Sequence, residues 1–343
     1  MIDTIPTEIW PSGATFDPAN GDVYVTEGAT NMSVVSGSSN TVIATIPVGT
    51  DPSGPVADPA NGDVYVPNLG VHSNGTGFVS VVSGSSNTVI DNIPVGTSPM
   101  GAAFDSSNGD IYVTNSGSDD VSVVSGSTNT VVANVSVGLD PWGAWGVTFD
   151  SLNGDVYVVN DLSNDVSVIA GSTNTVIATI PVGSLPRTAA FDPANGDVYV
   201  INYQSDNVSV VSGSTNKVIA TISVGSSPQG AVYDTSDKDM YVTNTGSDSV
   251  SILAPGTPPP SSNSNSAPTF LGLPGYVGYL LIGTIAAIVV VALAVVMSRK
   301  REPIAASPPQ VLSPAPAEPT PPTEESGGQP LPAGNSEEAQ SEN

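Results

Sequence analysis

Few residues in this chain could carry out acid–base, nucleophilic or metal-dependent chemistry. The 343 residues include no Cys and only one His, His72, which excludes thiolate zinc sites, cysteine nucleophiles and histidine-rich metal centres. His72 has no sequence neighbour that would complete a catalytic triad or a metal pair. We therefore predict no catalytic residue, no metal and no cofactor, and a protein that is not an enzyme.

Carboxylates are abundant, but many of them lie in repeated turns. The sequence Asp-Pro-Ala-Asn-Gly-Asp occurs at residues 17–22, 58–63 and 192–197. Asp and Asn oxygens suit Ca²⁺, yet the alternating ligand spacing and the closing Glu of an EF-hand are missing. Hydrogen bonds from Asp and Asn to their own backbone account for these residue types beside a Gly. We interpret the segments as turns, with calcium binding as the alternative.

A different group of residues could bind a ligand without transforming it. The motif Pro-x-Gly recurs along the chain, and its middle residue varies: Ser12, Ser53, Met100, Trp142, Gln229, and Arg187 in a Pro-Arg-Thr variant. Trp and Arg dominate binding hot spots, and Trp stacks on the faces of sugars. We predict a ligand site formed by Met100, Trp142, Trp145, Arg187 and Gln229. The alternative is that these are ordinary exposed loop residues.

These residues must be positioned by six repeats. The Asp that ends the first apolar run of each repeat recurs at intervals of 41 to 47 residues, as Asp17, Asp58, Asp105, Asp150, Asp192 and Asp234. Each repeat contains four short runs rich in β-branched and aromatic residues, separated by Gly, Pro, Asn and Ser, which is typical of strands and turns. Four strands per repeat of this length indicate an all-β protein, a β-propeller that spans residues 1–254.

Differences in repeat length fall on one side of the predicted propeller. One residue is missing between residues 26 and 32, five are added at 69–77 and three at 141–149. All three changes lie between the second and third strands of a repeat or between repeats, and both kinds of loop leave the same face of a four-stranded meander. Insertions gathered on one face favour that face for binding. The alternative is that loops on either face tolerate insertion.

The two ends of the repeat region complement each other. Residues 1–6, Met-Ile-Asp-Thr-Ile-Pro, align with the fourth strand at 176–181, Val-Ile-Ala-Thr-Ile-Pro. The last repeat stops after its third strand, at residues 250–253. We predict that the N-terminal strand completes the last blade and closes the ring, which removes two open sheet edges.

The second strands carry the motif Tyr-Val-Thr-Asn, at residues 112–115 and 241–244. The other copies are Tyr-Val-Thr-Glu (24–27), Tyr-Val-Pro-Asn (65–68), Tyr-Val-Val-Asn (157–160) and Tyr-Val-Ile-Asn (199–202). Motif and repeat length resemble the YVTN-family β-propellers of archaeal surface-layer and bacterial surface proteins. The resemblance covers residues 1–254 and implies a cell-surface propeller; rings in that family often have seven blades, so the blade number stays open. We interpret the Asn of the motif as a turn residue rather than a ligand.

Beyond the repeats the composition changes. Residues 255–275 are rich in Pro, Ser and Asn and form a predicted linker. Residues 276–297 carry no charge and are long enough for a transmembrane helix. Arg299-Lys300-Arg301 then place the C-terminus in the cytoplasm and the propeller outside the cell, by the positive-inside rule. The acidic remainder, 298–343, is predicted to be a disordered cytoplasmic tail.

The charge balance limits the partners. The net charge is −26, and half of the 6 Lys and Arg lie at residues 299–301. Nucleic-acid binding requires clusters of basic residues on the folded domain and is therefore excluded. We predict cell-surface glycans or envelope proteins as partners. Four sequons are candidates for glycosylation outside the membrane: Asn31, Asn74, Asn134 and Asn207.

The start of the chain raises a separate question. Met1 occupies the position of Val42, Val131 and Val176 in other repeats, and a GTG codon encodes Val internally but Met at initiation. We hypothesise that the chain begins upstream, with a signal peptide and one more blade. The alternative is a complete six-bladed chain exported by other means.

Three functions fit this organisation. The leading hypothesis is a non-enzymatic surface protein used for surface-layer structure, adhesion, or glycan or protein binding. The second is a hydrolase or lyase that uses Asp residues and a metal on the loop face. The third is a surface sensor that signals through the acidic tail.

Overall fold

The computed structural model describes residues 4–70, 77–141 and 146–254. The predicted linker, transmembrane helix and tail lie outside these ranges, as do His72, Asn74, Trp142 and Trp145. Within the described ranges, no helix has the length and apolar character needed to cross a membrane.

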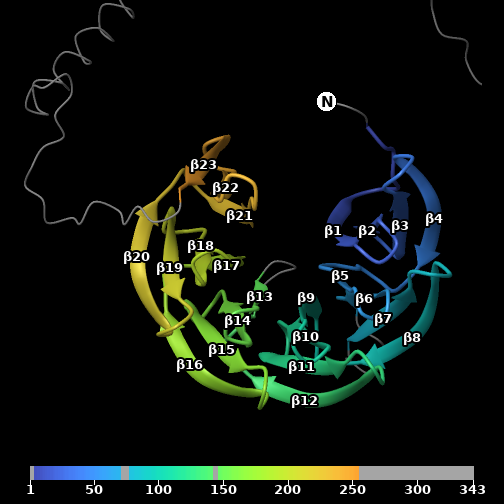
Figure 1. The fold of residues 1–343 in the computed structure, drawn as a ribbon, viewed down its shortest axis with the longest axis horizontal. Helices are drawn as coiled ribbons and strands as arrows, with labels where there is room; N and C mark the ends of the chain where they lie inside the picture. Colours follow the sequence, from blue (N-terminus) through green and yellow to red (C-terminus); the bar gives the residue numbers. More distant parts are fainter. Residues whose placement is uncertain (1–3, 71–76, 142–145, 255–343) are drawn as a thin grey trace, which may run out of the picture. The chain divides into compact units, whose positions relative to one another are not determined.

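Six antiparallel sheets, here called blades A to F, follow one another along the chain, and strands pair in sequence order within each (Figure 1). Blade A contains β1 (Pro11–Asp17), β2 (Asp22–Glu27), β3 (Asn31–Ser36) and β4 (Thr41–Pro47); blade B contains β5 (Val56–Asp58), β6 (Asp63–Asn68), β7 (Phe78–Ser83) and β8 (Thr88–Pro94). Blade C contains β9 (Pro99–Asp105), β10 (Asp110–Asn115), β11 (Asp120–Ser125) and β12 (Thr130–Ser136); blade D contains β13 (Val147–Asp150), β14 (Asp155–Asn160), β15 (Asp165–Ala170) and β16 (Thr175–Pro181). Blade E contains β17 (Pro186–Asp192), β18 (Asp197–Asn202), β19 (Asn207–Ser212) and β20 (Lys217–Ser223); blade F contains β21 (Pro228–Tyr233), β22 (Met240–Asn244) and β23 (Ser249–Leu253). The predicted four-stranded repeats are thereby confirmed for blades A to E.

The place of a strand within its blade explains its hydrophobic pattern. In blade C, the third strand β11 is buried on both faces, and Val121, Val123 and Val124 are all fully buried. The fourth strand β12 has one face toward solvent, so Val132 is 54% exposed while Val135 is buried. Near-continuous apolar runs therefore indicate the inner strands, and alternation of exposed and buried residues indicates the outer strand.

The hydrophobic core lies between neighbouring blades rather than within one. At the contact of blades C and D, Tyr112 and Val123 of blade C pack against Val156, Val158 and Ile169 of blade D. The other neighbouring blades form equivalent clusters. Each blade therefore buries its apolar residues mainly against its neighbours.

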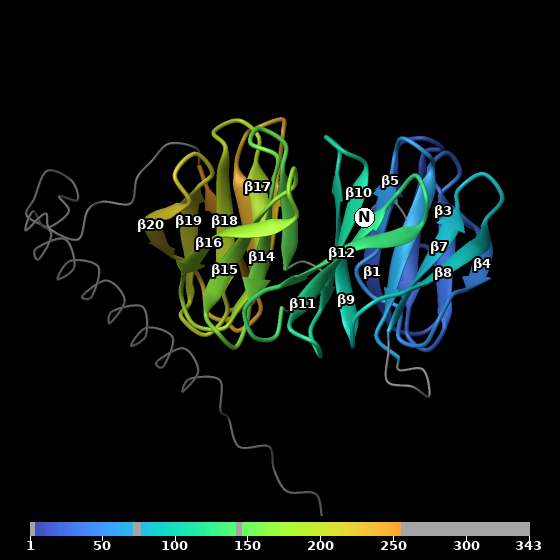
Figure 2. The same ribbon diagram turned by 90° about the horizontal axis from the view of Figure 1, so that it is seen from below.

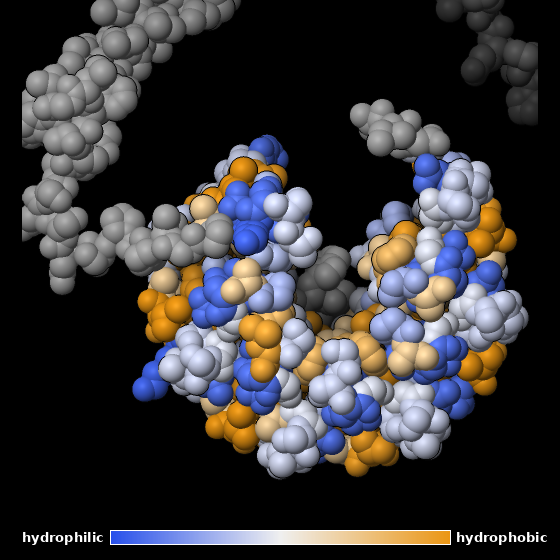
Figure 3. All heavy atoms as spheres, viewed as in Figure 1, coloured by the Kyte–Doolittle hydropathy of each residue, from blue (hydrophilic) through white to orange (hydrophobic). Residues whose placement is uncertain are grey.

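The blades stand side by side in an arc that remains open between blade F and blade A (Figures 1 and 2). In the space-filling view of Figure 3, the described atoms of these two blades do not meet. The predicted closure by residues 1–6 is not observed: β23 is the edge of blade F, and the Gly28 N–H of blade A donates to the carbonyls of Ile9 and Trp10. The curvature of the arc depends on the angle between each pair of neighbouring blades. The repeat sequence does not specify these angles, so it did not predict whether the ring closes.

Candidate functional site

The described loops divide between two faces of the arc. On the first, here called the turn face, the turn between the first and second strands of a blade meets the turn between its third and fourth strands. In blade D, for example, the Gly171 N–H donates to the Gly154 carbonyl at 3.0 Å. On the second, the loop face, the loop between the second and third strands of a blade meets the connection from the preceding blade. In blade C, the Gly117 N–H donates to the Thr97 carbonyl at 3.0 Å. This pairing confirms the prediction that both variable loop types share one face.

The repeated Asp-x-x-Asn-Gly-Asp segments form side-chain turns. In blade A, Asp17 Oδ1 accepts the Ala19 N–H at 2.8 Å, and Asn20 Oδ1 accepts the Asp22 N–H at 2.8 Å. Gly21 follows at φ +79°, a conformation that strongly favours Gly. The interpretation of these segments as turns is confirmed. Among the residues that the structure describes, no three His, Cys, Asp or Glu side chains are grouped to hold a metal ion.

The same turns join blades A to E in succession, through a set of contacts that we call the blade latch. Between blades C and D, the latch consists of three contacts. Asn108 Nδ2 donates to the Gly171 carbonyl at 3.2 Å, and Tyr112 donates its hydroxyl to Asn174 Oδ1 at 2.6 Å. Asp105 Oδ2 lies so close to Gly171 that a Cβ on that Gly would be 2.5 Å from it.

The tyrosine contact of the latch recurs at four joints. The donor–acceptor pairs are Tyr24–Asn87, Tyr65–Asn129, Tyr112–Asn174 and Tyr157–Asn216, at 2.6–3.3 Å. Burial raises the pKa of Tyr65, Tyr112 and Tyr157 to about 12, so these hydroxyls remain protonated donors at neutral pH. The acidic turn motif is therefore a structural device of the blade contacts.

The Asn of the Tyr-Val-Thr-Asn motif has a different role from the predicted one. Asn115 is fully buried as the last residue of β10, and its Nδ2 donates to Asp120 Oδ1 at 2.7 Å and to Ser122 Oγ at 3.0 Å. It also packs against Gly96 of the incoming connection, where a Cβ would lie 2.6 Å away. The prediction of a turn residue was wrong because the side chain clamps the next strand and the preceding connection.

Asp161, Arg187 and Tyr203 form a cluster of polar and aromatic side chains on the loop face that is suited to binding. The Arg187 guanidinium lies 3.8 Å from the centroid of the Tyr203 ring, and both side chains are half-buried. Asp161, from the preceding blade D, is 4% exposed. Arg187 is the only Arg within the described ranges, and Lys217 and Lys238 belong to turn-face segments. Stacking on an aromatic ring fixes the plane of the guanidinium and the direction of its donors.

The carboxylate of this cluster is electrostatically unusual. Burial raises the pKa of Asp161 despite the opposing positive charge of Arg187, and the nearby Asp140 raises it further. The Asp161 backbone N–H donates to the Asp140 carbonyl at 3.0 Å, while its side-chain Oδ1 accepts no hydrogen bond from any residue that the structure describes. A buried acceptor without a donor is costly, so a ligand hydroxyl or amide at this point would be stabilised.

The predicted ligand residues are only partly brought together. Arg187 and Gln229 lie on adjoining inner strands, where Thr188 Oγ1 donates to the Gln229 carbonyl. Met100 is half-buried at the start of β9 in blade C, two blades from Arg187, and Gln229 is exposed. Trp142 and Trp145 lie outside the described residues. The structure therefore places Arg187 and Gln229 on neighbouring strands and Met100 apart from them.

Sequence reasoning missed Asp161 and Tyr203. Both occupy the position directly after the motif Asn, where the other described repeats have Gly28, Leu69, Ser116 and Thr245. This position varies between constant flanks just as the Pro-x-Gly position does. Comparing both variable positions of neighbouring repeats would have indicated the cluster.

The sequons differ in accessibility. Asn134 is exposed on the outer strand β12 of blade C, where it accepts a hydrogen bond from Ser122 through Oδ1 and leaves Nδ2 toward solvent. Asn31 Nδ2 is bound to Glu8 Oε2 at 2.6 Å, and Asn207 is half-buried against Asn202. Asn74 lies outside the described residues. Of the described sequons, Asn134 is the best placed for a glycan.

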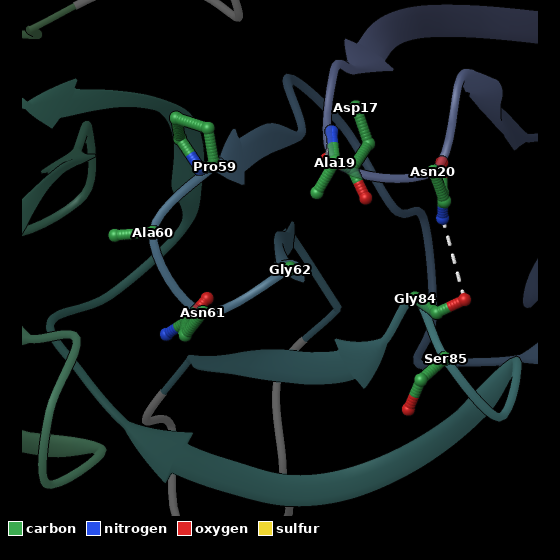
Figure 4. A pocket seen from close by; sticks show the side chains of 9 residues that line it. All are labelled: Asp17, Ala19, Asn20, Pro59, Ala60, Asn61, Gly62, Gly84 and Ser85. Atoms are coloured by element: carbon green, nitrogen blue, oxygen red, sulfur yellow. Dashed lines mark hydrogen bonds between the residues drawn. The ribbon is translucent and has the colours of Figure 1, made fainter.

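A cavity of about 270 Å³ opens on the turn face between blades A and B (Figure 4). Its lining is mostly small: Asp17, Ala19, Asn20, Pro59, Ala60, Asn61, Gly62, Gly84 and Ser85. The Asn20 Nδ2 donates across it to the Gly84 carbonyl at 3.3 Å, and Asp17 is fully buried behind the turn. Asn20, Gly84 and Asp17 belong to the blade latch, so the cavity lies at the surface end of the contact between two blades.

Comparison with known proteins defines the class. No family model and no curated protein matches the sequence. The structure resembles the WD40 β-propeller domain of Doa1, with a TM-score of 0.56 and 14% identity over 72% of this chain and 80% of that one. A chain of Kuenenia stuttgartiensis hydrazine synthase matches at a TM-score of 0.48 and 14% identity, over 74% of this chain and 98% of that one. The protein is a six-bladed β-propeller, a fold that supports binding or scaffolding.

Proposed function

We propose that the protein is a non-enzymatic binding module of the cell surface, whose loop face recognises hydroxyl-rich ligands such as glycans through Asp161, Arg187 and Tyr203. The observation that carries this proposal is the stacked Arg187–Tyr203 pair beside the buried Asp161 carboxylate. Arg187 supplies donors in a fixed plane, and Asp161 Oδ1 supplies an acceptor without a partner. Sugar hydroxyls both donate and accept, and therefore match this combination.

The surface location in this proposal is supported by the sequence. The Tyr-Val-Thr-Asn repeats resemble those of YVTN-family surface propellers, and residues 276–297 form an uncharged stretch followed by Arg299-Lys300-Arg301. A single membrane anchor with the propeller outside would present the loop face to surface-layer or envelope components. We propose this arrangement for adhesion or surface-layer structure.

Replacing Arg187 is expected to abolish most glycan binding. Arg187→Ala should weaken binding about 30-fold, equivalent to about 2 kcal/mol, because the stacked donors are lost and Asp161 is left without its counter-charge. Arg187→Lys should recover little, since an ammonium lacks the planar donor geometry. The measurement is titration of the detergent-solubilised protein against a panel of neutral and acidic oligosaccharides. Lys238→Ala, on the turn face, is the matched control, and equal losses in both variants would contradict the proposal.

Removing the uncharged segment is expected to release the protein from membranes. A variant lacking residues 276–297 should move from the pelleted membrane fraction to the supernatant, because the segment contributes the apolar length needed to span a bilayer. A deletion of equal length within residues 302–343 serves as control and should stay in the pellet. Membrane retention of the first variant would refute the anchor.

A further inference from the structure

Three turns on the turn face share one sequence that contains the reactive dipeptide Asn-Gly. Residues 17–25, 58–66 and 192–200 all read Asp-Pro-Ala-Asn-Gly-Asp-Val-Tyr-Val. In each turn the Asn is exposed, and its Oδ1 accepts the N–H of the Asp two residues further on at 2.8 Å. The Gly N–H donates to the carbonyl of the first Asp at 2.8–2.9 Å. Asn20, Asn61 and Asn195 are therefore matched in sequence, exposure and local geometry.

The three Asn side chains differ in their contact with the following blade. Asn20 Nδ2 donates to the Gly84 carbonyl of blade B at 3.3 Å (Figure 4), and Asn61 Nδ2 donates to the equivalent carbonyl of blade C at 3.1 Å. Among the residues that the structure describes, Asn195 Nδ2 reaches only the Tyr199 hydroxyl of its own blade, at 3.4 Å. Asn195 therefore lacks the contact between blades that holds the other two.

The sequence of blade F accounts for this difference. In the blade latch, the acceptor belongs to the turn after the third strand of the following blade, which reads Gly-Ser-Ser-Asn at 84–87 and Gly-Ser-Thr-Asn at 126–129. The last Asn of this turn also accepts the tyrosine hydroxyl. The aligned residues 255–258 of blade F read Pro-Gly-Thr-Pro. The sequence of the latch turn is therefore not repeated where blade E would need it.

An Asn-Gly dipeptide can lose ammonia without an enzyme. When a base removes the proton of the Gly N–H, the nitrogen bonds to the Asn Cγ, the Cγ–Nδ2 bond breaks, and Nδ2 takes up a proton and leaves as ammonia. Water then opens the resulting succinimide at either carbonyl, which yields Asp or isoaspartate. The Gly N–H and the Asn amide must first leave their hydrogen bonds, so every contact that holds the turn slows the reaction.

We propose that Asn195 is a site of spontaneous deamidation, and that it reacts faster than Asn20 and Asn61 because no contact with a following blade holds its side chain. This inference goes beyond the proposed function and does not depend on it. One hydrogen bond contributes about 1 kcal/mol, which corresponds to about a fivefold difference in the population of the opened turn.

The reaction adds a negative charge to the turn of blade E. Burial, and then the charge of Asp192, raise the pKa of Asp197, which lies two residues from Asn195. A carboxylate at position 195 adds a further like charge beside both groups. Isoaspartate also inserts a methylene into the backbone of the turn. Deamidation therefore destabilises this turn, and the fraction of altered molecules increases with time.

Peptide mapping of the full-length, detergent-solubilised protein tests the proposal. The protein is kept folded at mildly alkaline pH, sampled over time and digested with pepsin at acidic pH, and mass spectrometry gives the deamidated fraction of each Asn. Peptides that extend past the shared sequence are distinguished by the residues that follow it. We expect deamidation about fivefold faster at Asn195 than at Asn20 or Asn61. Equal rates in the folded protein, or the slowest rate at Asn195, would overturn the proposal.

The unfolded chain is the control for local sequence. Because the three Asn residues have the same neighbours, we expect equal rates for them in denaturant. Faster reaction of Asn195 in the unfolded chain as well would assign the difference to something other than the blade contact, and would overturn the proposal.

Gly84→Ala tests whether the blade contact protects an Asn. A Cβ on Gly84 would lie 2.9 Å from Asn20 Nδ2 and would displace it from the Gly84 carbonyl. We expect the rate at Asn20 to rise toward that at Asn195. The rate at Asn153, which donates to a carbonyl of blade E at 3.0 Å, should not change. An unchanged rate at Asn20 would show that the contact does not protect, and would also overturn the proposal.

Discussion

Gly171→Ala is expected to lower the free energy of unfolding by about 3 kcal/mol and the Tm by roughly 6–12 °C. A Cβ at this position would lie 2.5 Å from Asp105 Oδ2 of blade C and 2.6 Å from the Gly154 carbonyl of its own blade. Neither atom can move freely, because Asp105 Oδ1 is held by the Ser107 N–H at 2.8 Å and the Gly154 carbonyl accepts the Gly171 N–H. Denaturant unfolding followed by far-UV circular dichroism measures the change.

The matched control for this variant is Gly230→Ala. A Cβ on Gly230, in the inner strand β21, would meet only the Thr243 hydroxyl at 3.2 Å, and the side chain can adjust. We expect a loss below about 1 kcal/mol for this change. Adding Asp105→Ala to the Gly171→Ala variant should recover part of the loss, because the contact between blades is then relieved. Equal losses for Gly171→Ala and Gly230→Ala would mean that the latch does not require Gly.

The features that were predictable from the sequence are those set by short-range chemistry. Strand boundaries followed from apolar runs and from turns such as Asp17–Gly21, whose side-chain hydrogen bonds are local. The division of loops into two faces followed from the meander alone. The openness of the arc was not predictable, because it depends on how the blades pack on one another, which a repeat alignment does not measure.

The candidate site was predictable only in part, for a related reason. Arg187 stood out because its residue type is rare in the chain. Its partner Tyr203 comes from the neighbouring strand of the same blade E. Asp161 comes from blade D and reaches Arg187 only through the contact of blades D and E. The prediction that Asn115 is a turn residue failed likewise, because its contacts with Ser122 and Gly96 involve another strand and the preceding connection. Contacts between residues far apart in the sequence thus determine the roles of Arg187 and Asn115, which residue type alone does not predict.

Stability is expected to rise, rather than fall, when the solution is acidified from neutral pH. Burial raises the pKa of seven Asp side chains, namely Asp63, Asp110, Asp140, Asp150, Asp155, Asp161 and Asp197. Each of these groups binds a proton more tightly in the folded chain than in the unfolded chain. Their stabilising contribution is therefore complete below the unfolded carboxyl pKa of about 3.9 and is lost as the pH rises through the folded values. Asp234 has the opposite sign, because hydrogen bonds from Ser236 lower its pKa.

The measurement is the Tm of the protein between pH 7 and pH 4, and we expect it to increase toward pH 4. Protonation also reduces the self-repulsion of a chain with a net charge of −26. Asp150→Asn should flatten the profile by stabilising the protein at pH 7, because Asp150 is 1% exposed and an amide oxygen can still accept the Leu152 N–H. Asp234→Asn should do the reverse and lower the Tm at pH 7, since its carboxylate is stabilised when ionised. A Tm that declines steadily from pH 7 to pH 4 would show that buried carboxylates do not govern the stability of this propeller.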